Sequence, residues 1–380
     1  MDLIEKIGEN IGKAQVRAPN LFLLGLIISL IVIIPGTTFL LSHVEPSLEK
    51  TLPQNVIEVE TMNDMRTQFG ADMMQIIIRT NLPTSDIRTP KVINYVDTLS
   101  QKLRENDYIL QVDNIADIIK AYNNGVVPKS LPKIKSILHN NPYTKFFINY
   151  DYSTTIIQIK SDTGADSKII KRVVEDIEDS ISSLETKNPG VETEITGFNS
   201  IDKATFEVII KDFMNITGLS FLFMLIFLLF YFKSIRKVIM SLSVIMISLL
   251  LTAGITGYLA ITMTVVTMVA GAMIMALGIS YGINVTYEYY VLRKEFSKKQ
   301  TIIKLNTQIL RALVGSSLTT GAGFLALLFG VIPAMKNLGI VLAIGIVITL
   351  FVSVLFLPVI IIKLDTKSME EKRKWKWQNT

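Results

Sequence analysis

The stretch VVTMVAGAMIMALGISYGINVTYEYY, from Val265 to Tyr290, decides the fold of this chain. It is long enough to cross a bilayer, for which a helix needs about 20 mostly apolar residues. Its first half is rich in small residues and methionine, whereas its second half carries polar side chains from Ser280 to Glu288. Polar groups in hydrocarbon are costly unless they face protein or water. We therefore expect a central transmembrane helix whose polar side faces other helices.

The composition also indicates a membrane protein and excludes several kinds of chemistry. Of the 380 residues, 49% are hydrophobic, which is high for a soluble protein. The absence of cysteine excludes disulfides, thiol nucleophiles and thiolate metal sites. His43 and His139 are far apart, no phosphate-binding loop motif occurs, and the polar residues lack the acid–base partners that a nucleophile needs. We expect no enzyme activity, no cofactor and no metal.

Six apolar segments are long enough to span a membrane. The first follows a polar N-terminus, residues 1–20, and is too long for the apolar core of a signal peptide. We therefore expect it to remain as an uncleaved first span. The predicted spans are 21–43, 213–232, 238–258, 263–290, 309–330 and 338–362, and a charged tail follows at 363–380.

Residues 44–205 form the one large polar region between predicted spans. Strand-like runs at 73–80, 108–112, 153–160 and 191–195 alternate with amphipathic helical patterns at 90–105 and 166–184. A pair of short helices, between 115 and 138, is inserted in the middle. This order predicts a split βαβ, ferredoxin-like α+β domain.

The charge distribution predicts the orientation in the membrane. Residues 44–212 carry more acidic than basic side chains, whereas the remainder is strongly basic. The N-terminus, the KSIRK turn at 233–237, the segment 293–304 and the tail are all basic, and six spans place them on one side. We expect a multi-pass protein of the cell membrane, with both termini cytoplasmic and 44–205 outside. The KRKWKW run at 372–377 favours membrane anchoring over nucleic-acid binding.

Motifs in and around four of the spans carry a resemblance to a known family. They are Thr196-Gly197-Phe198 with Asp212 and FKSIRK at 232–237, GISYGI at 278–283, SLTTGAGFLALL at 317–328, and Gly339 with Leu357-Pro358. Together they resemble the resistance–nodulation–division (RND) superfamily, and in particular its MmpL-like branch of hydrophobe and amphiphile efflux proteins. The resemblance covers nearly the whole chain.

The resemblance implies a fold, a function and a partner. The fold would be an α-helical membrane protein, a six-transmembrane-helix RND half-repeat with one extracytoplasmic ferredoxin-like, porter-type α+β domain between helices 1 and 2. The function would be proton-coupled export of hydrophobic or amphiphilic molecules such as membrane lipids. Because family members usually carry two such halves, this half-length chain would form a homodimer, with a trimer left open.

One position departs from the family pattern. The aspartate that the family uses as its proton relay in the fourth helix falls on Ser280, whereas Tyr281 keeps the aromatic partner. Serine does not titrate at physiological pH. The energy source therefore stays open between a proton gradient, a sodium gradient and no coupling.

The candidate site residues follow from this region, and each has two interpretations. Ser280 and Asn284 share one helical face, and we expect them to face Thr319 and Thr320 as a relay or cation site, or as interhelical hydrogen bonds.

Three further features complete the candidate set. Glu288 is a candidate for proton entry, or for an interfacial carboxylate that is paired with Arg293 or Lys294 or solvated. Asp212 is a candidate for an outer relay or for the junction between domain and membrane. Gly278 and Gly282 have the spacing of close helix packing.

Three functions are compatible with these observations. The first is a lipid or amphiphile transporter. The second is a lipid-binding sensor or scaffold of the sterol-sensing type, which the missing aspartate favours. The third is an accessory subunit of protein export of the SecD/SecF type, which has the same six-span plan.

Overall fold

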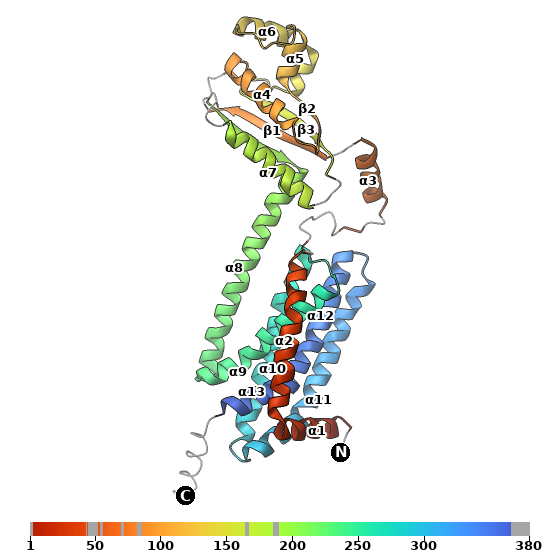
Figure 1. Cartoon of the computed structure of the whole chain (residues 1–380), viewed down its shortest axis with the longest axis vertical. Coiled ribbons are helices and arrows are strands. Elements are labelled where there is room, and N and C mark those ends of the chain that lie inside the picture. The colour runs from red at the N-terminus through yellow and green to blue at the C-terminus, as the bar shows by residue number, and fades with distance from the viewer. Residues whose placement is uncertain are drawn as a thin grey trace. The chain divides into compact units, whose positions relative to one another are not determined.

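A computed structural model describes residues 3–42, 44, 52–53, 56–69, 72–81, 86–163, 167–184 and 190–365 of the chain. The chain divides into two compact units, a membrane unit of Met1–Glu45 with Ile210–Thr380 and an α+β unit of Pro46–Ile209. Figure 1 shows the elements of both units. The predicted basic tail lies outside the described residues from residue 366 onward.

The α+β unit contains a four-stranded antiparallel sheet. Its strands are β1 (Asp72–Thr80), β2 (Ile109–Asp113), β3 (Thr154–Ser161) and β4 (Val191–Gly197), in the order β2-β3-β1-β4. Alternate residues of β1 are buried, as the period of two in a strand requires. These inward residues are Met74, Ile76 and Ile78, which form one core with the helices α4 (Pro90–Leu103) and α7 (Ser167–Ser183).

Three further helices belong to the same unit. The helices α5 (Ile115–Ala121) and α6 (Leu131–His139) and a short 3-10 turn, η2 (Pro142–Phe146), form the insertion between β2 and β3. Asn114 caps α5, because its side chain accepts a hydrogen bond from the Asp117 N–H. A helix before the sheet, α3 (Ile57–Phe69), was not among the predicted elements.

The membrane unit contains six helices that are long and apolar enough to cross a bilayer, counted over the described residues. They are α2 (Pro19–Ser42), α8 (Phe198–Phe232), α9 (Ile235–Tyr258), α10 (Val265–Leu292), α11 (Lys298–Leu325) with the 3-10 turn η4 (Ala326–Phe329), and α12 (Pro333–Phe351) with its continuation. The predicted central helix, α10, packs against α9, α11 and α12. Its place in the bundle is therefore central, as the sequence predicts.

Three spans differ clearly from the prediction. The second begins at Phe198 rather than at 213, because α8 starts directly after β4. The fifth begins at Lys298 and takes in most of the basic segment, because Ser297 and Gln300 form a capping box that starts the helix there. The sixth is interrupted by a π-helical turn, η5 (Val352–Phe356), before α13 (Leu357–Leu364). Pro358 lies just after the turn and has no N–H to donate, which explains an irregularity at this place.

The N-terminus is a helix as well. Residues 1–20 are expected to be a polar segment, but α1 (Leu3–Arg17) is an amphipathic helix packed on α11. Gly8 and Gly12 allow the two backbones to approach closely. A Cβ atom at Gly8 would lie 2.6 Å from the carbonyl oxygen of Asn306, and one at Gly12 would lie 2.8 Å from the Cα of Ile303.

Candidate functional site

The inner face of α10 packs against α9 through two glycines. A Cβ atom at Gly278 would lie 3.1 Å from the side chain of Ile245, and one at Gly282 would lie 2.7 Å from the Ser241 carbonyl oxygen. The Ser241 Oγ donates to the Gly282 carbonyl over 3.2 Å and lies 3.2 Å from the Thr286 Oγ1. Glycine at position 282 therefore lets the Ser241 side chain of α9 bond the backbone of α10 directly.

Tyr281 connects α10 to the fifth span. Its hydroxyl is 2.8 Å from the Ser317 Oγ, and both side chains are buried. The sequence marked Tyr281 as a candidate but did not mark Ser317. Two hydroxyls that share one hydrogen bond hold the helices in register.

Ser280 and Asn284 do not face the fifth span as expected. Both are exposed on the outside of α10, and Thr319 is exposed as well, whereas Thr320 is half-buried. The Thr319 hydroxyl donates to its own helix, to the carbonyls of Gly315 and Ser316. Adjacent residues in a helix point about 100° apart. Because Tyr281 and Gly282 occupy the inner face, position 280 is turned away from it, so the expected relay is not assembled within one chain.

The two candidate carboxylates are separate from this region. Glu288 is half-buried near the end of α10, and Asp212 is exposed on α8. Glu288 was expected to pair with Arg293 or Lys294 or to be solvated. The Arg293 guanidinium is instead bonded to Asp365, a residue that the sequence did not mark.

Asp365 is the centre of a buried charged cluster at the C-terminal end of α10. Its Oδ2 accepts hydrogen bonds from the Tyr289 hydroxyl at 2.6 Å and the Arg293 Nε at 3.1 Å, and its carbonyl accepts from the Lys298 Nζ at 2.8 Å. The Arg293 and Asp365 side chains are 6% and 2% exposed. One acidic residue directly after an apolar helix was the available signal, but a partner 72 residues away leaves no sequence pattern.

A second buried polar cluster surrounds the π turn of the sixth span. The Gln15 Nε2 of α1 donates to the carbonyls of Val354 and Leu355 over 2.8 and 3.0 Å. The Asn306 Nδ2 of α11 donates to the Gln15 Oε1 over 2.8 Å. Gln15 is fully buried, so this amide connects three parts of the membrane unit.

The α+β unit has its own electrostatic cluster around Asp86. Arg88 bonds the Asp86 carboxylate through Nε, and Lys135 lies 2.8 Å from its other oxygen. Partial burial works to raise the pKa of Asp86, but the hydrogen bonds from Arg88 and Lys135 outweigh it and hold the pKa well below its usual value. Hydrogen bonding to Asp86 raises the pKa of Arg88, which also lies over the ring of Tyr152.

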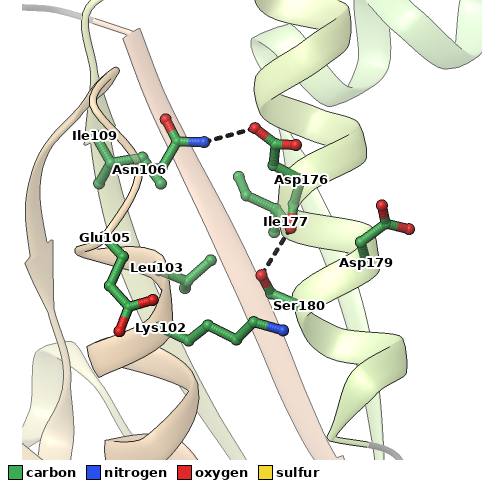
Figure 2. A pocket seen from close by; sticks show the side chains of 9 residues that line it. All are labelled: Lys102, Leu103, Glu105, Asn106, Ile109, Asp176, Ile177, Asp179 and Ser180. Atoms are coloured by element: carbon green, nitrogen blue, oxygen red, sulfur yellow. Dashed lines mark hydrogen bonds between the residues drawn. The ribbon is translucent and has the colours of Figure 1, made fainter.

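A surface groove of about 310 Å³ lies between the end of α4 and α7 (Figure 2). Its floor is formed by Leu103, Ile109 and Ile177, which belong to the core of the unit. Its rim carries Lys102, Glu105, Asn106, Asp176, Asp179 and Ser180, and the Asn106 Nδ2 donates to Asp176 over 2.7 Å. This polar, mainly acidic rim does not make an apolar chamber for an acyl chain.

Six apolar helices, one of them a glycine-packed central helix, define a multi-pass membrane protein over the described residues. Comparisons with known proteins identify the family. The model of the MMPL family matches residues 50–378. A relative from Methanocaldococcus jannaschii, named only as a membrane protein, is 33% identical over 353 residues, which cover 90% of each chain. The chain belongs to the MMPL family and is an MmpL-like member of the RND superfamily, a group of membrane transporters.

Proposed function

We propose that this protein exports hydrophobic or amphiphilic molecules, membrane lipids above all, across the cell membrane. The observation that carries the proposal is the second span, α8. It starts at Phe198, directly after β4, and continues without interruption to Phe232. Most of its apolar side chains are exposed, among them Met214, Ile216, Leu219, Leu222, Phe223, Ile226, Phe227 and Phe230. An amphiphile would leave the bilayer alongside this helix.

The orientation is part of the proposal. The basic segments at both ends and in the turns would lie in the cytoplasm, and the acidic α+β unit would lie outside. The strand order β2-β3-β1-β4, in which α4 connects β1 to β2 and α7 connects β3 to β4, supports a ferredoxin-like, porter-type domain in that position. Transport would then end in an extracytoplasmic domain.

A matched pair of substitutions tests the role of α8. Leu222 on α8 and Ile28 on α2 are aliphatic and similarly exposed, at 48% and 51%. The measurement is the movement of a fluorescent phospholipid between the leaflets of vesicles that contain the purified protein. Leu222→Ser should reduce the flux strongly, and Ile28→Ser should leave it near that of the unchanged protein. Equal effects of the two changes would remove α8 from the proposed path.

The energy source is the second question. Ser280 replaces the titratable group of the family, and Glu288 is the one carboxylate between Ile235 and Leu364 in the helices that the structure assigns to candidate spans. We propose that flux does not depend on Ser280 as a proton carrier. Imposed proton and sodium gradients, each with and without an ionophore, would separate coupled from uncoupled movement, and Ser280→Ala would be compared in each condition.

The absence of an acid at Ser280 also favours a second candidate, a lipid-binding sensor or scaffold. Such a protein would retain lipid through purification but move none under any gradient. Mass spectrometry of co-purified lipid, together with the vesicle assay, distinguishes the two functions. Retained lipid without flux supports the sensor, and flux supports the exporter.

We further propose that a second copy of the chain covers the outer face of α10. Ser280, Asn284 and Thr319 are exposed in a single chain, and polar groups that face hydrocarbon are costly. A homodimer would bury this face against its equivalent. Because the chain has no cysteine, a Ser280→Cys variant offers one thiol for cross-linking. Oxidation should give a covalent dimer, whereas an Ile28→Cys control should not.

A further inference from the structure

The N-terminal helix α1 has two faces with different surroundings. Its inner face contacts α11 through Gly8 and Gly12 and carries the fully buried Gln15. Its outer face is exposed and carries two large apolar side chains, Leu3 at 72% and Ile7 at 46% exposure. The basic residues Lys6, Lys13 and Arg17 are exposed as well. An apolar and basic outer face is typical of helices that lie in the headgroup layer of a membrane.

The chain connectivity places α1 at the membrane surface. Only Ala18 separates its last residue from Pro19, the first residue of the span α2. Figure 1 shows α1 at the end of the bundle where α11 begins, crossing the direction of the spans. Leu3 and Ile7 are therefore held at the level of the lipid headgroups, with basic side chains available to their phosphates.

The inner face of α1 contacts the π turn of the sixth span, where a helical hydrogen bond is missing. The carbonyl of Val354 lies four residues before Pro358, which has no N–H, so its usual α-helical donor is missing. The Gln15 amide fills this place and also bonds the Leu355 carbonyl. Asn306 fixes the orientation of the amide by donating to its oxygen. Without Gln15, the buried carbonyl of Val354 and the partly buried carbonyl of Leu355 would lose this donor.

We propose that α1 is a membrane-surface latch: its outer face binds anionic lipid headgroups, and its Gln15 holds the π turn of the sixth span closed. Through Gln15, the binding of α1 to lipid headgroups thereby controls the conformation of the π turn inside the bundle. The proposal goes beyond transport, because it holds whether the protein moves lipid or only senses it. Gln15 acts here as a positioning residue.

A thiol reporter at the π turn measures whether the latch is closed. Ser353 is fully buried, its hydroxyl has no partner in the part of the chain that the structure describes, and the adjoining cavity of about 10 Å³ has room for at most one water molecule. A maleimide therefore cannot reach position 353 while the turn is closed. In the cysteine-free chain, Ser353→Cys provides a single site, and its rate of reaction with N-ethylmaleimide reports opening.

The first arm of the experiment tests Gln15. In the full-length protein in phosphatidylcholine–phosphatidylglycerol vesicles, Gln15→Leu should raise the rate at least about tenfold, because one buried and one partly buried carbonyl lose this donor. Asn10→Leu, an exposed change on the same helix, should leave the rate unchanged. Asn306→Leu should raise the rate, and the double variant should exceed Gln15→Leu little, because both residues act in one network. An unchanged rate in Gln15→Leu overturns the latch.

The second arm tests the lipid partner with a variant that leaves the interior intact. Lys6, Lys13 and Arg17 are exposed, and the one ion pair that the structure gives to any of them joins Lys13 to Glu9 of the same helix. The triple change to glutamate should raise the rate in vesicles with phosphatidylglycerol and leave it unchanged in pure phosphatidylcholine. An equal response in both kinds of vesicle, or none in either, overturns the binding of anionic lipid by α1.

Discussion

Polar side chains are exposed in the middle of α10, whereas charged side chains are buried at its C-terminal end. In the middle, Ser280 and Asn284 point away from the bundle, and the interior holds only neutral contacts such as Tyr281 with Ser317. At the C-terminal end, Arg293 forms a buried ion pair with Asp365 that Tyr289 and Lys298 complete. The charge that the family pattern places at mid-helix is absent there, whereas an unanticipated charge cluster lies at the helix end.

Along α10, the residues expected to stabilise the fold and the residue expected to act in function therefore lie at different places. The Asp365 carboxylate accepts hydrogen bonds from two side chains, and the backbone carbonyl of the same residue accepts a third. A residue held in this way is suited to fixing the helix ends rather than to carrying ions. An exposed serine is free to meet a partner chain or lipid. We therefore expect changes at the helix end to reduce stability and changes at position 280 to affect association or flux.

The largest expected effect is the loss of the buried ion pair. Asp365→Ala leaves the Arg293 guanidinium buried without its carboxylate, which costs about 3–5 kcal/mol. Asp212→Ala removes the same group from an exposed position and should change stability by less than about 0.5 kcal/mol. Equilibrium unfolding in detergent micelles measures both. Equal stabilities of the two variants would contradict a stabilising role for the buried ion pair at the helix end.

The next effect concerns the glycine contact between α10 and α9. Gly282→Ala drives a methyl group toward the Ser241 carbonyl, so overpacking should cost about 1–3 kcal/mol. Gly315 on α11 has no atom within 4 Å of its would-be Cβ atom. Gly315→Ala should therefore be neutral or stabilising by about 0.4–1 kcal/mol. The same unfolding assay measures the stability of both variants. If Gly282→Ala were as stable as the unchanged protein, α9 and α10 would not be packed this closely.

A smaller effect is expected for the neutral contact at the middle of α10. Tyr281→Phe removes one buried hydrogen bond and should cost about 1 kcal/mol. Removing both partners in Tyr281→Phe with Ser317→Ala should cost less than the sum of the two single changes. A double-variant cycle measures this coupling. Strict additivity would show that the two hydroxyls are not bonded to each other.

Asp86 of the α+β unit provides a reference carboxylate outside the membrane. Lys135→Met should cost about 0.2–1 kcal/mol at neutral pH, because the ion pair is partly exposed. The pKa of Asp86 is lowered in the folded protein, so the stabilisation is present above the unfolded value of about 3.9 and is lost as the pH falls toward the folded value. Unfolding measured across this range should show the two proteins converging in acid. A difference that persists in strong acid would contradict the ion pair.

The smallest expected effect on folding is at Ser280. Ser280→Ala should leave the stability of the detergent-solubilised monomer within about 0.5 kcal/mol, because the side chain is exposed. The same change should weaken the dimer, which sedimentation in detergent at several protein concentrations would detect. A large loss of monomer stability would place Ser280 inside the bundle after all.

The sequence predicted which segments form helices and strands better than it predicted which side of each helix faces its neighbours. Hydrophobic length predicted the six spans, and the strand-like run at 73–80 predicted β1, because both signals are local. The direction in which Ser280 points depends on which side of α10 the glycines offer to α9, and this needs the neighbouring helix. Arg293 and Asp365 meet across 72 residues, so neither could be assigned a partner from its own surroundings.

The N-terminal helix shows a different limit. The charges of residues 3–17 suggested a solvated segment, since the apolar positions are few. The helix is held by glycine backbone contacts, by the Gln15 amide, and by Ile4, Ile11 and Val16, which pack against the buried core. The glycine contacts bury backbone rather than side chains, so this part of the packing leaves no hydropathy signal.

The π turn at Val352–Phe356 also bears on how this span tolerates changes in length. A π turn holds one residue more than the α-helical turn that it replaces, which is how a single inserted residue is accommodated in a helix. Deleting one residue between 352 and 356 would restore regular winding and keep α13 facing its neighbours. The same deletion within α12 would rotate every later residue by about 100°. Insertions and deletions in related chains should therefore concentrate at this turn.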